Sequence, residues 1–128
     1  MIKKHPKPTE SELQILRILW TEGPSTVREV NNVLGAEKQV GYTTTLKLMQ
    51  IMAEKNLVNR NTSSKTHIYK ANILEHDTQK SLIKSLVDQA FGGSAMELVL
   101  QALGNHKTTS EELDQIKELI SQLENVKK

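Results

Sequence analysis

The chain has 128 residues, no cysteine, 3% aromatic residues and a net charge of +2, which excludes disulfides and thiolate metal sites and leaves Leu, Ile, Val and Met to build the core. Residues 1–72 hold eleven Lys/Arg and six Asp/Glu, a net charge of +5, whereas residues 73–128 hold six Lys/Arg and nine Asp/Glu, a net charge of −3. The basic first half can therefore bind a polyanion; the alternative is a chance imbalance among solvated charges. No stretch has the pattern of a signal peptide or a membrane span, and we expect a cytoplasmic protein that does not enter the membrane.

Two helices with the same start signal are predicted in the first 40 residues. Thr9 with Glu12 has the spacing of a capping box and predicts a first helix that ends before a Gly-Pro pair. Thr26 with Glu29 repeats this spacing, and Gly35 is expected to end the second helix.

A third helix is predicted from about Thr43 to Lys55. Helical spacing places on its buried face Thr45, Leu48, Met49 and Met52. Its outward side carries Thr43, Thr44, Lys47 and Gln50. Leu46 lies near that side, where it either contacts thymine methyls or indicates that the assigned face is rotated by part of a turn. Tyr42 precedes the helix and either hydrogen-bonds a phosphate or packs over the helix start.

The outward side chains of this helix suit DNA recognition. Lys47 can reach guanine acceptors or a phosphate, Gln50 can pair with adenine, and Thr44 can contact a thymine methyl or a phosphate. Each has an ordinary alternative: Thr43 can be only a helix cap, and Lys47 only a solvated charge. Together, at the start of a third helix, they favour an interpretation in which this helix reads the major groove.

A basic hairpin is predicted to follow, with strands at residues 58–61 and 66–71, and with Ile68 inward and Tyr69 on the other face. Three helices and such a hairpin form the winged helix-turn-helix layout, which we expect as residues 1–72. Arg60 and Lys65 lie in this wing, where they can contact phosphates, although as single residues they are ordinary surface groups.

The second half, residues 73–128, is predicted to be a helical dimerisation domain, so that the protein as a whole is mainly α. Its helices are interrupted at Gly92-Gly93 and carry apolar stripes that 56 residues cannot bury well alone. Pairing with a second copy would cover the stripes; packing against the first half is the alternative. The residues expected in the dimer contact are Leu82, Leu86, Phe91, Leu98, Leu103, Ile116, Leu119, Ile120 and Leu123.

Enzymatic function is not expected. The four histidines are scattered, without the spacing of metal ligands, at His5, His67, His76 and His106. The sequence has no glycine-rich phosphate loop and no nucleophile motif. We therefore predict a protein without a catalytic site, a metal or a cofactor.

Over nearly its full length the chain resembles the penicillinase-repressor (BlaI/MecI-type) family of bacterial winged-helix regulators. The matching segments are TESELQILRILW at 9–20, STVREV at 25–30, GYTTT at 41–45, EKNLV at 54–58, IY at 68–69, FGG at 91–93 and LVL at 98–100. Each segment is weak alone, but their order and spacing are fairly specific. The resemblance implies a helical dimerisation domain after the winged helix, and repression by binding to a palindromic operator.

The resemblance also implies which residues read DNA and how repression ends. It maps operator reading onto Thr43, Thr44, Leu46 and Lys47; better-known relatives have arginine at the position of Leu46, so their operator sequence does not carry over. In the resistance repressors a membrane sensor leads to cleavage of the tail, which implies a sensor-linked protease as a partner. The corresponding bond here, Gln101-Ala102, differs from the Asn-Phe pair of those relatives. Copper-responsive relatives carry tail cysteines, which this chain lacks.

The sequence thus predicts a homodimeric repressor that binds double-stranded DNA through its third helix and wing. The rival prediction is a winged-helix protein-interaction module without sequence-specific DNA binding. Such a module would have a third helix without exposed base-reading groups and a neutral wing.

Overall fold

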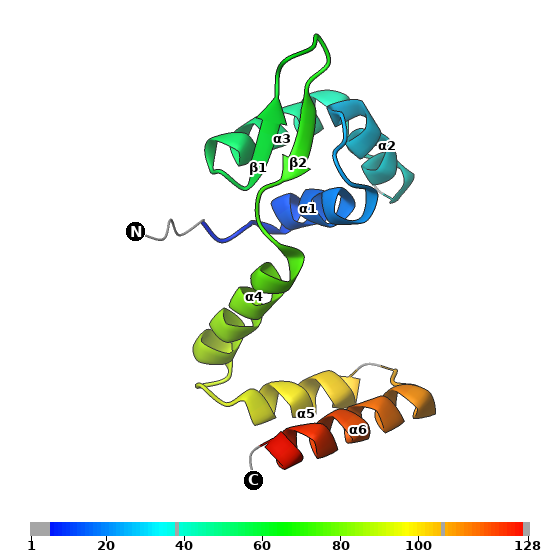
Figure 1. Ribbon diagram of the computed structural model, residues 1–128, viewed down its shortest axis with the longest axis vertical. Coiled ribbons are helices and arrows are strands. Elements are labelled where there is room, and N and C mark those ends of the chain that lie inside the picture. The colour runs from blue at the N-terminus through cyan, green and yellow to red at the C-terminus, as the bar shows by residue number, and fades with distance from the viewer. Residues whose placement is uncertain (1–5, 38, 106, 127–128) are drawn as a thin grey trace. The chain divides into compact units, whose positions relative to one another are not determined.

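The structure, a computed structural model, describes residues 6–37, 39–105 and 107–126 (Figure 1). His5 and His106 lie outside these residues. The chain forms two compact units, residues 1–82 and 83–128, which are described separately below. The division into 1–72 and 73–128, which the sequence predicts from a winged-helix pattern followed by a helical tail, stays a prediction. No helix among the described residues has the length and apolar character needed to span a membrane.

Helix α1 (Glu10–Glu22) begins at the predicted capping box. The Glu12 N–H donates to Thr9 Oγ1 at 3.2 Å, and the Thr9 N–H donates to Glu12 Oε1 at 2.9 Å. These bonds satisfy N–H groups that a helix start otherwise leaves unpaired. Gly23 ends the helix with φ of +83°, a conformation that glycine adopts without a steric penalty.

Helix α2 (Val27–Glu37) follows the second predicted capping box, in which the Thr26 N–H donates to Glu29 Oε1 at 2.9 Å and the Glu29 N–H donates to Thr26 Oγ1 at 3.1 Å. The prediction that Gly35 ends this helix is wrong. The helix continues to Glu37, and Gly35 does not adopt a left-handed backbone conformation. A glycine inside a helix costs only about 1 kcal/mol relative to alanine, which the surrounding helix can tolerate.

Helix α3 (Tyr42–Glu54) starts one residue earlier than predicted. Gly41 is its N-cap and makes no side-chain cap bond, so Tyr42 is helical and Thr43 is not the cap. At the other end Asn56 has φ of +63°. The Asn56 N–H donates to the Ala53 carbonyl at 3.1 Å and the Leu57 N–H to the Met52 carbonyl at 2.9 Å, the two bonds of a Schellman motif. This motif ends α3 and directs the chain into the wing.

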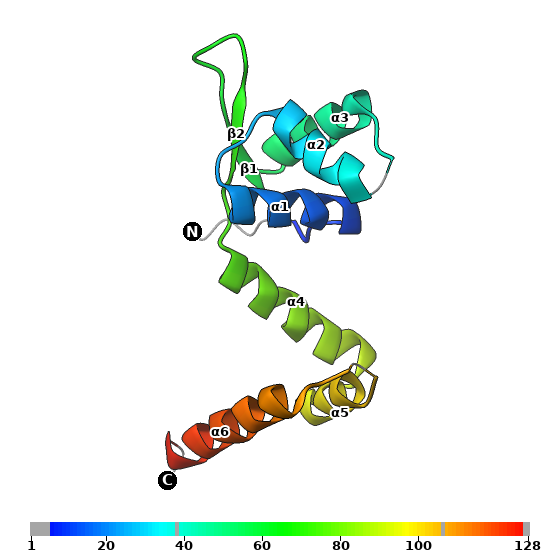
Figure 2. The same cartoon turned by 90° about the vertical axis from the view of Figure 1, so that its right-hand side faces the viewer.

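The wing consists of strands β1 (Val58–Asn61) and β2 (Ile68–Ala71), paired antiparallel. In the register Val58 faces Ala71 and Arg60 faces Tyr69. Ser25 adds an isolated bridge to the outer side of β2, with hydrogen bonds of 2.9 and 2.8 Å to the backbone of Tyr69. The hairpin therefore joins the segment between α1 and α2, and its tip extends beyond α2 and α3 (Figure 2).

The predicted facing of β2 is wrong, because Tyr69 is the buried residue at 1% exposure and Ile68 is only half-buried. The reason is the strand parity. Directly paired residues and their second neighbours share one face of a hairpin. Val58 is buried, so Ala71 opposite it and Tyr69 two residues before share the core side. The strand also begins at Ile68 rather than at residue 66.

The core of the first unit lies between the three helices and the sheet, and it is almost wholly aliphatic. Its buried apolar members are Ile15, Leu16, Leu19, Val27, Val30, Met49, Met52, Leu57, Val58 and Tyr69. Tyr69 is the one aromatic residue of this cluster. The core thus places the wing strands and the inner face of α3 against a common centre.

A buried ion pair joins α1 to the end of α3. Glu12 is 2% exposed, and Lys55 Nζ donates to its Oε2 at 2.8 Å. Burial raises the pKa of Glu12, but the Lys55 hydrogen bond and charge together with the bonds from Thr9 outweigh it, so the pKa lies below its ordinary value of 4.5. Glu12 therefore serves the capping box and the ion pair at once.

Helix α4 (Glu75–Ala90) starts within the first unit. The segment before it is held by Trp20, whose indole N–H donates to the Ile73 carbonyl at 3.0 Å. Along α4 the buried residues are Thr78 and Val87, at 7% and 9% exposure.

The second unit contains the end of α4 and the helices α5 (Ala95–Asn105) and α6 (Ser110–Val126). The predicted break after α4 is confirmed: Gly92 and Gly93 have φ of +57° and +86°. Within α5 and α6, which lie wholly in the described part of the chain, no side chain is buried. Their apolar stripes therefore have no intramolecular cover comparable to that of the first unit.

Candidate nucleic-acid interface

The outer side of α3 presents the polar residues that the sequence singled out. Thr45, Met49 and Met52 are fully buried, as predicted, and Leu48 packs partly against the core. The predicted site residues on the opposite side of the helix are all exposed: Tyr42, Thr43, Thr44, Lys47 and Gln50. The assigned face is thus not rotated.

Thr45 fixes this orientation by a bond to the neighbouring helix. Its hydroxyl lies 2.8 Å from Asn31 Oδ1 in α2 and 3.4 Å from the Gly41 carbonyl. Thr45 is fully buried, so the hydroxyl needs such a partner. The bond to Asn31, with the buried side chains of Met49 and Met52, keeps this side of α3 toward the core, so the exposed row faces outward.

Leu46 lies at the border between the two sides of α3. It is half-buried and packs partly against the core, yet it also lines an open groove. Because Leu46 contacts both the core and the groove, helical spacing alone could not assign it to one side of α3.

This groove, of about 390 Å³, lies between α2, α3 and the wing, and we refer to it as the wing groove. It brings together four of the eight residues predicted to bind DNA, namely Tyr42, Leu46, Gln50 and Lys65. It is also lined by residues that the sequence reasoning missed: Thr26, Arg28, Thr66 and His67. No Asp or Glu is among its lining residues, so the fixed charge that it presents is positive.

Arg28 is the most informative of the missed residues. Its guanidinium carbon lies 5.1 Å from the ring centroid of Tyr42, within the range of a cation–π contact. The signal that could have found it is topological: in a helix-turn-helix, the first turn of the second helix lies near the start of the third. A basic residue there and an aromatic residue at the start of α3 are therefore neighbours.

The two predicted cations of the wing, Arg60 and Lys65, line different hollows. Arg60 is exposed on β1 and lines a second hollow, of about 400 Å³, with Gln50 and Glu54. Lys65 is exposed in the hairpin loop. Within that loop the Ser64 hydroxyl donates to the Thr66 carbonyl at 2.7 Å, and this bond restrains the tip. Gln50 lines both hollows and so links the outer side of α3 to the wing.

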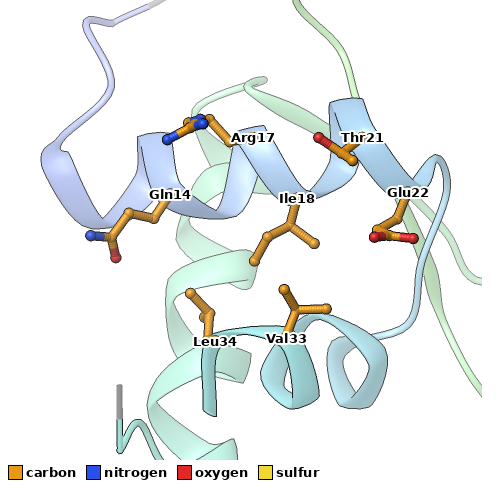
Figure 3. A pocket seen from close by; sticks show the side chains of 7 residues that line it. All are labelled: Gln14, Arg17, Ile18, Thr21, Glu22, Val33 and Leu34. Atoms are coloured by element: carbon orange, nitrogen blue, oxygen red, sulfur yellow. The ribbon is translucent and has the colours of Figure 1, made fainter. Parts of the chain in front are cut away.

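A further cavity, of about 270 Å³, lies between α1 and α2. Figure 3 shows the Ile18 side chain pointing toward Val33 and Leu34, with Gln14 and Arg17 further along α1. None of the residues that line this cavity comes from α3 or the wing. It is separate from the candidate interface.

The residues predicted to make the dimer contact are partly or largely exposed in the single chain. Leu82, Phe91, Leu98 and Ile116 are half-buried. The exposed fractions of the others are 46% for Leu86, 37% for Leu103, 54% for Leu119, 50% for Ile120 and 53% for Leu123. Among the described residues, no group of three or more His, Cys, Asp or Glu could hold a metal ion.

Comparison with known proteins gives a consistent result. The family model of the penicillinase repressor matches residues 8–122. The chain is 22% identical to the penicillinase repressor of Bacillus licheniformis over 127 residues, which covers 99% of each protein. It is 36% identical to the transcriptional regulator BlaI of Mycobacterium tuberculosis over 59 residues, or 45% of this chain and 43% of that one.

Two solved structures resemble the first unit. The solution structure of the DNA-binding domain of the repressor BlaI matches with a TM-score of 0.52 at 22% identity, covering 59% of this chain and 93% of that one. The monomeric form of B. licheniformis BlaI, in complex with the blaP half-operator, matches with a TM-score of 0.51 at the same identity and coverage. This likeness and the observed elements confirm the predicted winged-helix fold.

Proposed function

The chain belongs to the penicillinase-repressor family, and from this membership we propose that it represses transcription as a homodimer bound to a two-fold operator. Members of this family are DNA-binding transcriptional repressors and not enzymes. The finer parts of the proposal are the residues that read the operator, the dimer contact and the symmetry of the site.

The exposed row on α3 supports its role as the recognition helix. Thr43, Thr44 and Lys47 lie in its first two turns, the part of a recognition helix that contacts base edges. Hydroxyl, ammonium and amide groups are the side chains that pair with those edges. Arg60 and Lys65 would meet phosphates, which position the protein without specifying sequence.

The apolar faces of α4, α5 and α6 support dimerisation. Leu119 and Ile120 each leave half or more of their surface to solvent in the single chain. A second copy would cover these faces and remove apolar area from water. The dimer would then place two copies of α3 in successive major grooves, with half-sites about 10 base pairs or a multiple apart.

The resemblance implies a sensor-linked protease as the partner that ends repression. Gln101 and Ala102 are both exposed on α5, so a protease could approach the bond between them. Cutting there would separate α6 from the rest of the tail and so weaken the dimer.

Binding to the DNA upstream of the chain's own gene tests the proposal. We expect the full-length protein to shift this duplex, and to do so much less at ~200 mM than at ~50 mM salt, because counterions are released from the phosphates. A double-stranded RNA competitor should not displace it. Absence of binding to any duplex would overturn the function and favour a protein-interaction module.

Lys47→Ala tests the reading role of α3. If Lys47 contacts a base, the variant loses about 1–3 kcal/mol of affinity for the operator and little for a scrambled duplex. Lys80→Ala is the matched control, because Lys80 is also exposed but lies on α4. Equal affinity of wild type and Lys47→Ala, with the same salt dependence, would remove Lys47 from the interface.

A further inference from the structure

The wing groove has the chemistry of a site for one DNA strand's phosphodiester backbone. Arg28 and Lys65 bring positive charge to it from two separate elements, α2 and the hairpin loop, and Gln50 adds an amide. Its lining residues include no carboxylate that would repel a phosphate. The nearest acid along α2, Glu29, accepts the Thr26 N–H at 2.9 Å in the capping box.

Arg28 is exposed, and it takes part in neither of the ion pairs that the described residues form. Its recorded partner is the ring of Tyr42, with the guanidinium carbon 5.1 Å from the centroid. A guanidinium carries five N–H donors, so a cation–π contact with one ring still leaves donors available to oxygen acceptors. The N–H fork of arginine matches the geometry of a phosphate.

We propose that Arg28 contacts a DNA phosphate at the wing groove and that Tyr42 is a positioning residue, whose ring holds the guanidinium over the groove. The inference rests on the proposed function and adds α2 to its contacts with DNA. The site would then take a backbone segment beside the major groove that α3 enters, with Arg28 on one side and Lys65 on the other. It also gives Tyr42 a role that depends on its ring and not on its hydroxyl.

Arg28→Ala in the full-length protein tests the contact. Because phosphates carry no sequence information, affinity should fall by a similar factor, roughly tenfold, for the upstream duplex and for a scrambled duplex. The slope of log affinity against log salt should become shallower by about 0.9 per chain bound. Arg28→Lys keeps the charge, so it should keep most of the slope while losing part of the affinity. An unchanged slope in Arg28→Ala would overturn the contact.

Arg17→Ala is the matched control, because Arg17 is an exposed arginine that lines the cavity between α1 and α2 and not the wing groove. It should leave both affinity and slope as in the wild type. If Arg17→Ala and Arg28→Ala lower the slope equally, the effect is one of net charge and the proposal fails. Thermal unfolding followed by circular dichroism should be unchanged in both variants.

Two substitutions of Tyr42 separate the ring from the hydroxyl. Tyr42→Phe keeps the ring and should bind like the wild type, whereas Tyr42→Leu should weaken binding several-fold. In the Arg28→Ala background, Tyr42→Leu should add little, because the residue that it positions is gone. Equal losses in Tyr42→Phe and Tyr42→Leu would overturn the positioning role. Failure of the wild-type chain to bind any duplex is a different outcome, which rejects the proposed function itself.

Discussion

Lys55 connects the end of α3 to α1 through one buried carboxylate. Removing one partner of such a pair leaves the other charge buried and unpaired, which is far more costly than losing a surface pair. Glu12 also accepts the Thr9 N–H in the capping box. The side chains of this pair therefore hold the end of α3 against α1.

We expect Lys55→Met to lower the free energy of unfolding by about 3 kcal/mol at neutral pH, the lower end for buried pairs because Lys55 remains 33% exposed. The pKa of Glu12 is lowered by folding, so its contribution is complete above the ordinary value of 4.5 and is lost as the pH falls through the folded value. The difference between wild type and variant should therefore narrow below pH 4.5. Urea unfolding of both proteins at several pH values measures this difference in the free energy of unfolding.

Lys84→Met provides the control for this prediction. Lys84 pairs with Asp88 at 2.9 Å, but the two side chains are 79% and 54% exposed. Such surface pairs contribute between about 0 and 1 kcal/mol. If Lys84→Met and Lys55→Met lose similar amounts of unfolding free energy, burial of the Glu12–Lys55 pair does not add to its contribution to stability.

At the scale of single residues, the sequence was most informative where spacing alone decides. The capping boxes at Thr9 and Thr26 and the buried position of Thr45 follow from local periodicity, and all are confirmed. Arg28 was missed because its ring partner lies on another helix. Local spacing carries no information about which residue of α2 faces the start of α3.

The packing of α2 against α3 decides which residues of α3 face outward. Thr45 is buried and bonded to Asn31, whereas Thr44, one residue before it, is exposed. Consecutive helix residues lie about 100° apart, so the two threonines serve different purposes. Thr45 orients the helix, and Thr44 belongs to the row that we propose contacts DNA.

Valine substitutions at these two neighbours should give opposite results. Thr45→Val leaves the Asn31 oxygen without its donor and should cost about 1–3 kcal/mol of stability. Thr44→Val should change stability by less than about 0.5 kcal/mol but weaken operator binding, because it removes an exposed hydroxyl. Chemical unfolding and DNA titration of both variants measure the two effects. A stability loss in Thr44→Val equal to that in Thr45→Val would contradict this division.

At the scale of elements, two predictions failed for reasons that lie outside the local pattern. Gly35 was expected to end α2, but glycine commonly ends a helix by adopting a left-handed conformation, and Gly35 does not adopt one. Tyr69 was assigned to the wrong face of β2, although the parity of the hairpin, counted from buried Val58, would have placed it inward. The face on which Tyr69 lies can be deduced only once it is known which residue of β1 pairs with which residue of β2.

The charge and the apolar surface are distributed differently along the whole chain. The basic half forms the winged-helix fold with its own core, whereas the acidic half forms helices with exposed apolar stripes. The counts of charged residues predicted the contrast in charge, helical spacing predicted the apolar stripes, and the fold class is confirmed. In the dimer that we propose, a second copy covers the stripes, and no single-chain pattern specifies the geometry of that contact.

Ile120→Lys in the full-length chain tests the dimer. Ile120 is 50% exposed, so the single chain should fold, but a lysine in an apolar contact between two copies would bury an unpaired charge. We expect the dimer dissociation constant to rise by roughly tenfold or more, and operator affinity to fall with it. Ser121→Lys, at a position outside the apolar stripe of α6, should sediment like the wild type. A dimer unaffected by Ile120→Lys would place the contact elsewhere.

The indole bond at the end of the wing has an optical consequence. Trp20 is the single tryptophan of the sequence, and its N–H is held by the carbonyl of Ile73, between β2 and α4. Indole emission responds to hydration and to loss of such a bond. Unlabelled protein therefore contains an intrinsic fluorophore that reports on how the segment between β2 and α4 is held against α1.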